Sequence, residues 1–109
     1  MNGSILIPEK FKLNGKVINV IIDNEYCNDG ELNSYDAPIF GESDFDDKII
    51  RLASTQHDKK ISKKDKEVTY FHELVHMILD SMGKDKLKYD EDFVESFSEK
   101  LYEYEKTKQ

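Results

Sequence analysis

The chain has little cysteine, no long apolar segment and no excess of basic charge. Cys27 is the only cysteine, which excludes an internal disulfide and disfavours a zinc site built from thiolates. No apolar run approaches the ~20 residues that span a bilayer. Residues 1–10 do not have the pattern of a secretory signal peptide. We therefore expect a cytoplasmic protein that does not contact a membrane.

Nucleic-acid binding is also disfavoured by the charge pattern. The formal net charge is −7, and the lysines between residues 59 and 66 alternate with Asp58 and Asp65. A nucleic-acid surface needs clustered cations that displace counterions from the phosphates. The sequence contains no such basic stripe, so we expect no direct nucleic acid binding.

Length and composition indicate one folded domain with a very polar surface. A chain of 109 residues is long enough for one hydrophobic core but not for two. Its six tyrosines and six phenylalanines are too many for a typical disordered chain. We expect a single domain over residues 1–109, with a strand-rich half at about 5–55 and a helical half at about 62–107.

The first half has the residue pattern of antiparallel strands joined by turns. Asn14-Gly15 lies between two β-prone runs and favours a tight hairpin, because both residues tolerate positive φ. The expected strands are 11–13, 16–23, 37–41 (weakened by Pro38) and 48–53, with a loop at 24–34 and an acidic turn at 43–47. These features predict a small antiparallel sheet of three to four strands, connected as a meander.

From Ser62 onward the pattern changes to that of helices. The segment from Ser62 to Asp65 resembles a capping box, and residues 68–79 are apolar on most sides, as in a buried helix that Gly83 would end. A second helix is expected at about 90–106, with an apolar stripe of Phe93, Phe97, Leu101 and Tyr104. The predicted fold class is α+β, with the sheet packed on the first of these two helices.

Residues 72–76, His-Glu-Leu-Val-His, have the strongest functional pattern in the chain. Side chains four residues apart lie on one helical face, so His72 and His76 can bind one tetrahedral Zn²⁺. Glu73 would lie beside the ion and could accept a proton from a water that zinc has acidified. If no metal were bound, burying these three groups without partners would cost on the order of several kcal/mol. We predict a zinc site with Glu73 as the general base.

A catalytic zinc usually has a third protein ligand and an open position for water. Asp80 lies too far along the same helix from His72 to share one ion. His57 lies in the polar segment before the helix and stays an alternative. The second helix offers further carboxylates, namely Asp90, Glu91, Asp92, Glu95 and Glu99.

Among these carboxylates we choose Glu95 as the third ligand. The small Ser98 would allow the two helices to approach closely, and Glu99 could accept a hydrogen bond from the free nitrogen of a ligand imidazole. Glu95 shares a helical stripe with Glu91, Ser98 and Tyr102, and Tyr102 is a candidate for stabilising the oxyanion. If the helix instead began at Asp92, Glu95 would only cap its first turn.

These motifs also resemble a known family. The pattern of His72-Glu-x-x-His76 followed by Glu95-Ser-Phe-Ser-Glu99 is similar to the gluzincin arrangement, and the run TYFHELVHMILDSMG resembles small phage and mobile-element proteins related to the ImmA/IrrE metallopeptidases. The resemblance implies a curved antiparallel sheet packed on the active-site helix, with an edge strand that holds an extended substrate. Residues 48–53 are our candidate for that strand. The resemblance also implies a protein substrate, such as a repressor-type regulator of a phage or mobile element.

Two other functions fit the same residues. Zinc could join the two helices in a non-catalytic protein-interaction module, or the chain could be a pseudoenzyme that binds metal but admits no substrate. Glu73 favours the enzyme, because a structural zinc site is normally closed by four protein ligands and needs no base. The leading prediction is a zinc metallopeptidase that hydrolyses peptide bonds of a protein or peptide substrate.

Overall fold

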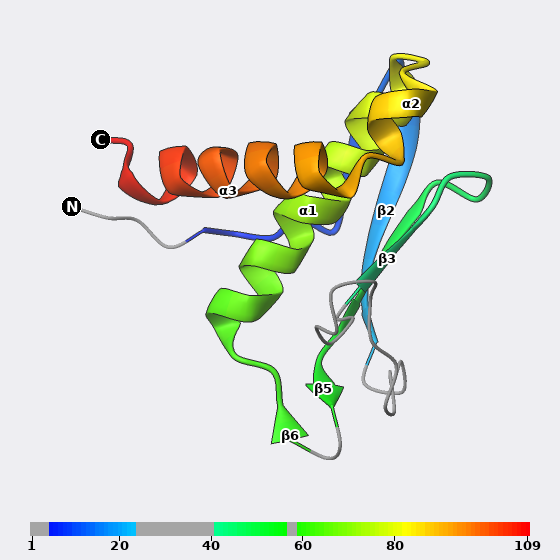
Figure 1. The fold of residues 1–109 in the computed structure, drawn as a ribbon. Coiled ribbons are helices and arrows are strands. Elements are labelled where there is room, and N and C mark those ends of the chain that lie inside the picture. The colour runs from blue at the N-terminus through cyan, green and yellow to red at the C-terminus, as the bar shows by residue number, and fades with distance from the viewer. Residues whose placement is uncertain (1–4, 24–40, 57–58) are drawn as a thin grey trace.

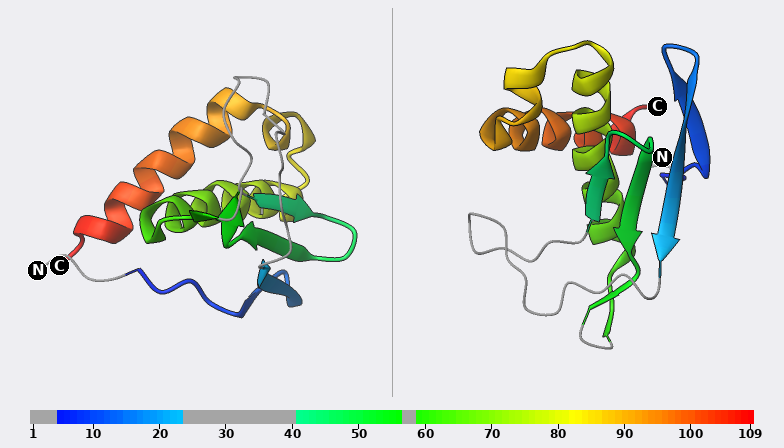
Figure 2. Two further views of the ribbon diagram at one scale, coloured as in Figure 1. Left: turned by 90° about the horizontal axis from the view of Figure 1, so that it is seen from below. Right: turned by 90° about the vertical axis from the view of Figure 1, so that its right-hand side faces the viewer.

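The computed structural model describes residues 5–23, 41–56 and 59–109. In this part of the chain, helix α1 (Lys63–Ser81) packs on one face of a four-stranded sheet, and helix α3 (Glu91–Thr107) crosses α1 (Figure 1). Figure 2 shows that both helices lie on the same side of the sheet. The architecture is α+β, as the sequence predicts. None of the described helices has both the length and the apolar character needed to cross a membrane.

Strands β1 (Lys10–Leu13) and β2 (Lys16–Asp23) form the predicted hairpin. Its turn residues Asn14 and Gly15 have φ angles of 54° and 75°. Positive φ at both central residues is typical of the tight turns that match the twist of paired strands. The Asn14-Gly15 prediction is therefore confirmed.

The predicted antiparallel meander is wrong, because the sheet is mixed. Strands β3 (Gly41–Asp44) and β4 (Ile49–Ala53) pair antiparallel with each other, but β4 pairs parallel with β2. The strand order is β1-β2-β4-β3. A parallel pair requires a crossover between its strands, and residues 24–40, where β2 leads on towards β3, lie outside the described residues.

The β3–β4 turn begins later than predicted. Residues 43 and 44, expected in an acidic turn, belong to β3, and the turn comprises residues 45–48. Asp44 Oδ1 accepts a hydrogen bond from the backbone N–H of Asp47 at 2.9 Å, which stabilises this turn locally. The expected strand 37–41 lies outside the described residues except for Gly41. Strands β5 (Thr55–Gln56) and β6 (Lys59–Lys60) make a separate small pair.

Helix α1 (Lys63–Ser81) follows the predicted boundaries closely. Ser62 caps its first turn, since the Ser62 side chain accepts a hydrogen bond from the N–H of Asp65 at 3.0 Å. Gly83 follows its end with a φ of 70°. The helix is buried on two sides. Its sheet side joins the cluster of Ile18, Ile50, Leu52, Tyr70, Phe71 and Met77, and its other side joins the cluster of Val75, Leu79 and Val94.

A four-residue helix, α2 (Asp85–Lys88), connects α1 to α3 (Glu91–Thr107) and was not predicted. Asp90 caps α3 by accepting a hydrogen bond from the N–H of Phe93 at 3.1 Å, so the helix does not begin at Asp92. Only half of the expected apolar stripe faces the core: Phe93 and Leu101 pack against it, but Phe97 is 51% exposed and Tyr104 is 60% exposed. Val94 and Ser98 are instead the buried residues of α3.

Candidate metal centre

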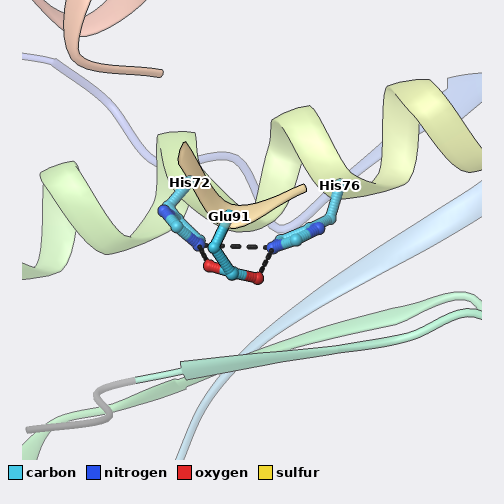
Figure 3. Close-up of side chains that lie close together, drawn as sticks. All are labelled: His72, His76 and Glu91. Atoms are coloured by element: carbon cyan, nitrogen blue, oxygen red, sulfur yellow. Dashed lines mark hydrogen bonds and ion pairs between the residues drawn. The ribbon is translucent and has the colours of Figure 1, made fainter. Parts of the chain in front are cut away.

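His72 and His76 point from successive turns of α1 toward one position (Figure 3). Their Nε2 atoms lie 3.2 Å apart. His76 is buried, with 8% of its surface exposed, and the side chain of His72 is 19% exposed. The convergence that the His-x-x-x-His spacing predicts is therefore present in the fold.

The other ring nitrogen of each histidine has a partner of its own. His76 Nδ1 lies 2.7 Å from the carbonyl oxygen of Lys88, and His72 Nδ1 lies 3.1 Å from a carboxylate oxygen of Glu95. A carbonyl oxygen or an ionised carboxylate can only accept a hydrogen bond, so the Lys88 carbonyl favours a proton on Nδ1 of His76 and the Glu95 carboxylate favours one on Nδ1 of His72. In a neutral ring with its proton on Nδ1, Nε2 is an unprotonated acceptor.

Glu91 completes the group from the first turn of α3. Its Oε2 lies 3.1 Å from His72 Nε2 and its Oε1 lies 3.3 Å from His76 Nε2. The Glu91 side chain is 44% exposed, so the group is open to solvent on that side. Within the described ranges, His72, His76 and Glu91 are the histidine, cysteine and acidic residues whose ligand atoms gather closely enough for one metal ion.

These four atoms are arranged so that they could share one metal ion. With both rings neutral and protonated at Nδ1, two nitrogens and two carboxylate oxygens are all acceptors and would need a shared cation, whereas a protonated imidazole would donate directly to Glu91. Two nitrogens bound to one tetrahedral zinc at about 2.0–2.1 Å lie about 3.3 Å apart, close to the observed 3.2 Å. Imidazole and carboxylate are also common zinc ligands.

The predicted third ligand, Glu95, has a different position in the structure. Its carboxylate contacts Nδ1 of His72 and not the Nε2 atom that faces Glu91. The arrangement proposed for Glu99, a carboxylate behind a ligand imidazole, is therefore made by Glu95, while Glu99 is exposed. Glu91, one helical turn earlier on the same stripe, is the better placed candidate ligand. The alternative His57 lies outside the described residues.

The candidate base, Glu73, is buried next to this group, with 8% of its surface exposed. Its Oε1 accepts a hydrogen bond from the hydroxyl of Ser43 at 2.7 Å. Burial raises the pKa of Glu73, while the hydrogen bond from Ser43 and the nearby imidazoles oppose this rise only in part. A carboxylate with a raised pKa is better matched to proton transfer near neutral pH than an ordinary one.

Strand β3 forms the sheet edge beside α1, and residues 48–53 do not. The expected substrate-binding strand 48–53 corresponds to β4, which lies between β2 and β3 inside the sheet, so that prediction is wrong. Side chains alternate along β3, and Ser43 faces α1 while Glu42 and Asp44 contact Arg51 at 3.3 and 3.8 Å. The edge strand is thus hydrogen-bonded directly to the candidate base.

Gly41 allows β3 to lie this close to α1. A Cβ atom at this position would lie 2.7 Å from Cγ2 of Thr69 and 2.9 Å from the carbonyl oxygen of Arg51. Both distances are shorter than real carbon contacts. A glycine at the start of β3 is therefore required for the approach that brings Ser43 to Glu73.

An open cavity of about 440 Å³ lies between the β3–β4 turn and α2. Ser43 and Phe45 line one side, and Lys88 and Tyr89 line the other. The Phe45 ring also contacts His76 edge-on, with ring centroids 6.4 Å apart. This cavity therefore lies close to His76 through their shared neighbour Phe45.

Three residues at the site were missed or passed over in the sequence analysis. Glu91 was noted on the helical stripe but not chosen, and Ser43 was assigned to a turn. Lys88 acts through its backbone carbonyl, which no side-chain pattern reveals. Tyr102, the candidate for the oxyanion, has its hydroxyl 3.5 Å from Glu67 Oε1 and its ring against Phe71, so its contacts lie elsewhere on α1.

Comparisons with known proteins add no family or neighbour. No protein-family model, no curated protein and no solved structure matches the chain. The functional interpretation therefore depends on the geometry of the chain itself.

Proposed function

We propose that this protein is a zinc metallopeptidase, and one observation carries the proposal. Two imidazole Nε2 atoms, in rings whose Nδ1 atoms each face an acceptor, lie within 3.3 Å of the same carboxylate and beside a buried glutamate. A salt bridge does not require that the second ring nitrogen of each histidine has its own hydrogen-bond acceptor. A metal-binding histidine typically has such an acceptor, because a proton held on Nδ1 leaves the lone pair of Nε2 facing the ion.

We assign the zinc ligands as His72, His76 and Glu91. Glu95 then supports His72 by accepting the Nδ1–H hydrogen bond, which fixes the ring orientation and raises the basicity of Nε2. This assignment keeps the zinc-ligand roles of the two histidines and exchanges the third ligand for the residue one turn earlier. Three protein ligands are the number typical of a catalytic zinc site.

Zinc bound here would supply Lewis-acid polarisation of the peptide carbonyl and would make water a stronger nucleophile near neutral pH. The chain supplies the proton transfer. Glu73 accepts the proton of the attacking water and returns it to the leaving amine nitrogen. Ser43 holds the Glu73 carboxylate through its hydroxyl at 2.7 Å, and burial keeps bulk water from competing for that carboxylate.

The substrate class is an extended protein segment. Edge strands bind such segments through backbone hydrogen bonds, and β3 is the edge beside Glu73. The cavity between the β3–β4 turn and α2 offers room for a side chain next to the scissile bond. The resemblance to ImmA/IrrE-type proteins suggests a repressor-type regulator as this substrate.

The proposal is tested by identifying cleaved bonds in a diverse peptide library and in a host cell extract. The protein is loaded with one equivalent of zinc, and new N-termini are identified by mass spectrometry. Glu73→Gln is the matched control, since it leaves every proposed zinc ligand in place. We expect new termini with the wild type that are absent with Glu73→Gln. Zinc-loaded wild type that yields the same termini as Glu73→Gln would contradict the enzyme and favour a zinc-stabilised interaction module.

A further inference from the structure

Lys88 contributes to the metal centre with its backbone and is anchored by its side chain. Its carbonyl oxygen accepts the Nδ1–H of His76 at 2.7 Å. Its ammonium group lies 2.9 Å from Asp80 Oδ1 and 3.4 Å from Asp85 Oδ1, and the side chain is only 9% exposed. A lysine is seldom buried to this extent unless it is paired, so this ion pair is a specific feature of the fold.

Aromatic rings enclose the same ammonium group. Lys88 Nζ lies 4.4 Å from the ring centroid of Phe45 and 4.9 Å from that of Tyr89, both within the range of cation–π attraction. Phe45 belongs to the β3–β4 turn and also contacts the His76 ring. The lysine side chain therefore joins α1, α2 and that turn around a single ligand histidine.

Helix α2 needs a tertiary contact such as the Lys88–Asp80 ion pair to hold the Lys88 carbonyl in place. It has four residues and no side-chain cap at its N-terminus. A helix this short is not stable by itself, because so few hydrogen bonds do not offset the nucleation cost. Asp80 lies one turn after His76 on α1, so the ligand and the anchor of its supporting carbonyl are on the same rigid element.

We propose that the Lys88–Asp80 ion pair positions the Lys88 carbonyl and thereby fixes the orientation and the Nδ1–H tautomer of His76. Lys88 and Asp80 are positioning residues: they act on the metal centre through the ring of His76. The expected effect on zinc binding rests on the proposed metal centre. The hydrogen bond between His76 Nδ1 and the Lys88 carbonyl oxygen can be tested without any metal.

The first test observes the His76 Nδ1–H proton by NMR in metal-free protein. A ring N–H bonded to a buried carbonyl exchanges slowly with water and gives a resolved resonance. We expect this resonance in wild type, its loss in Lys88→Met, and its recovery in Lys88→Arg, which keeps a cation within reach of Asp80. Lys86→Met is the matched control, because Lys86 is an exposed lysine on the same helix.

The second test measures zinc affinity by competition with a chelator, together with the visible spectrum of bound Co²⁺. We expect Lys88→Met to bind zinc about 10–100-fold more weakly than wild type, the usual effect of losing the partner of a ligand histidine. Lys88→Arg and Lys86→Met should bind within about threefold of wild type on that scale. The Co²⁺ spectrum should change in Lys88→Met, because the ring is no longer held.

Three outcomes decide the inference. A folded Lys88→Met variant that keeps both the slow Nδ1–H resonance and the wild-type zinc affinity overturns it. If Lys88→Met does not fold, Asp80→Ala provides the same comparison, because it removes the anchor and leaves the Lys88 backbone in place. If even the wild type binds no zinc, the proposed metal centre fails, while the NMR comparison still supports or overturns the positioning role.

Discussion

The hydroxyl oxygen of Ser43 lies 2.7 Å from Oε1 of Glu73 and 3.1 Å from the backbone carbonyl oxygen of the same residue. Ser43 is on the sheet edge β3, and Glu73 is on α1 between the two histidines. The proposed substrate-binding edge and the proposed base are therefore linked through one side chain.

This link predicts that Ser43→Ala lowers kcat. The Glu73 carboxylate loses the hydrogen bond that orients it, and we expect a decrease of about tenfold, a fraction of the 10²–10⁴ that a general base contributes. KM should change little, because the β3 backbone is unaltered. The measurement uses a peptide found in the library screen, with zinc content checked in parallel. An unchanged kcat would show that Ser43 does not orient the base.

Gly41→Ala should destabilise the fold and reduce activity together. The added methyl group would overlap Thr69 and the Arg51 carbonyl, so β3 would have to move away from α1. We expect a loss of about 1–3 kcal/mol in the free energy of unfolding, typical of overpacking a tight contact. Urea unfolding measures it, with Glu42→Ala on the exposed face of the same strand as control. Equal stability of both variants would contradict the close approach.

Asp80→Asn should change how stability depends on acid pH. Burial alone would raise the pKa of Asp80, but the hydrogen bonds and charges of Lys88 and Lys48 outweigh it and hold the pKa below its usual range. A depressed carboxylate pKa stabilises the fold above the unfolded pKa of about 3.9, and this stability is lost as the pH falls through the folded value.

At pH 7 the Asp80→Asn variant should therefore be less stable than wild type by about 1–2 kcal/mol. The difference should shrink as the pH falls from about 4 through the lower pKa that Asp80 has in the folded protein. Urea unfolding of metal-free protein at pH 7, 5 and 3 measures both effects. A difference that stays constant down to pH 3 would mean that Asp80 is not held as a charged partner of Lys88.

Glu95→Ala should weaken zinc binding without abolishing it. Glu95 contacts the Nδ1 of His72 at 3.1 Å, so its removal releases the ring but keeps the three ligand atoms. We expect an affinity about 10–100-fold lower, with one zinc still bound at saturating metal. Chelator competition gives the affinity, and Glu99→Ala, one turn further along and exposed, is the control. Complete loss of zinc in Glu95→Ala would restore Glu95 as a ligand.

Local features of the fold could be predicted because short-range chemistry determines them. Asn14-Gly15 specifies its hairpin through positive φ, and Ser62 begins α1 through its side-chain cap. The mixed strand order could not be predicted, because the pairing of β2 with β4 depends on the path of residues 24–40 and not on either strand. The short helix α2 has too few residues for a recognisable period.

The same distinction applies to the candidate metal centre. The helical spacing of His72 and His76 is local, so their convergence could be predicted. Glu91 and Glu95 lie one turn apart on one stripe, so the sequence alone does not distinguish them. Which of the two carboxylates faces the histidine Nε2 atoms depends on where α2 ends and where Asp90 caps α3. These two positions determine which turn of α3 lies next to His72 and His76.

The most direct test of the metal centre is the zinc content of the purified protein, measured by elemental analysis for wild type, Glu91→Ala and Glu95→Ala. We predict one equivalent of zinc in wild type, retention in Glu95→Ala when zinc is supplied in excess, and loss in Glu91→Ala. A wild type that takes up no zinc, or a Glu91→Ala variant that keeps a full equivalent, would contradict the assignment of His72, His76 and Glu91 as the metal ligands.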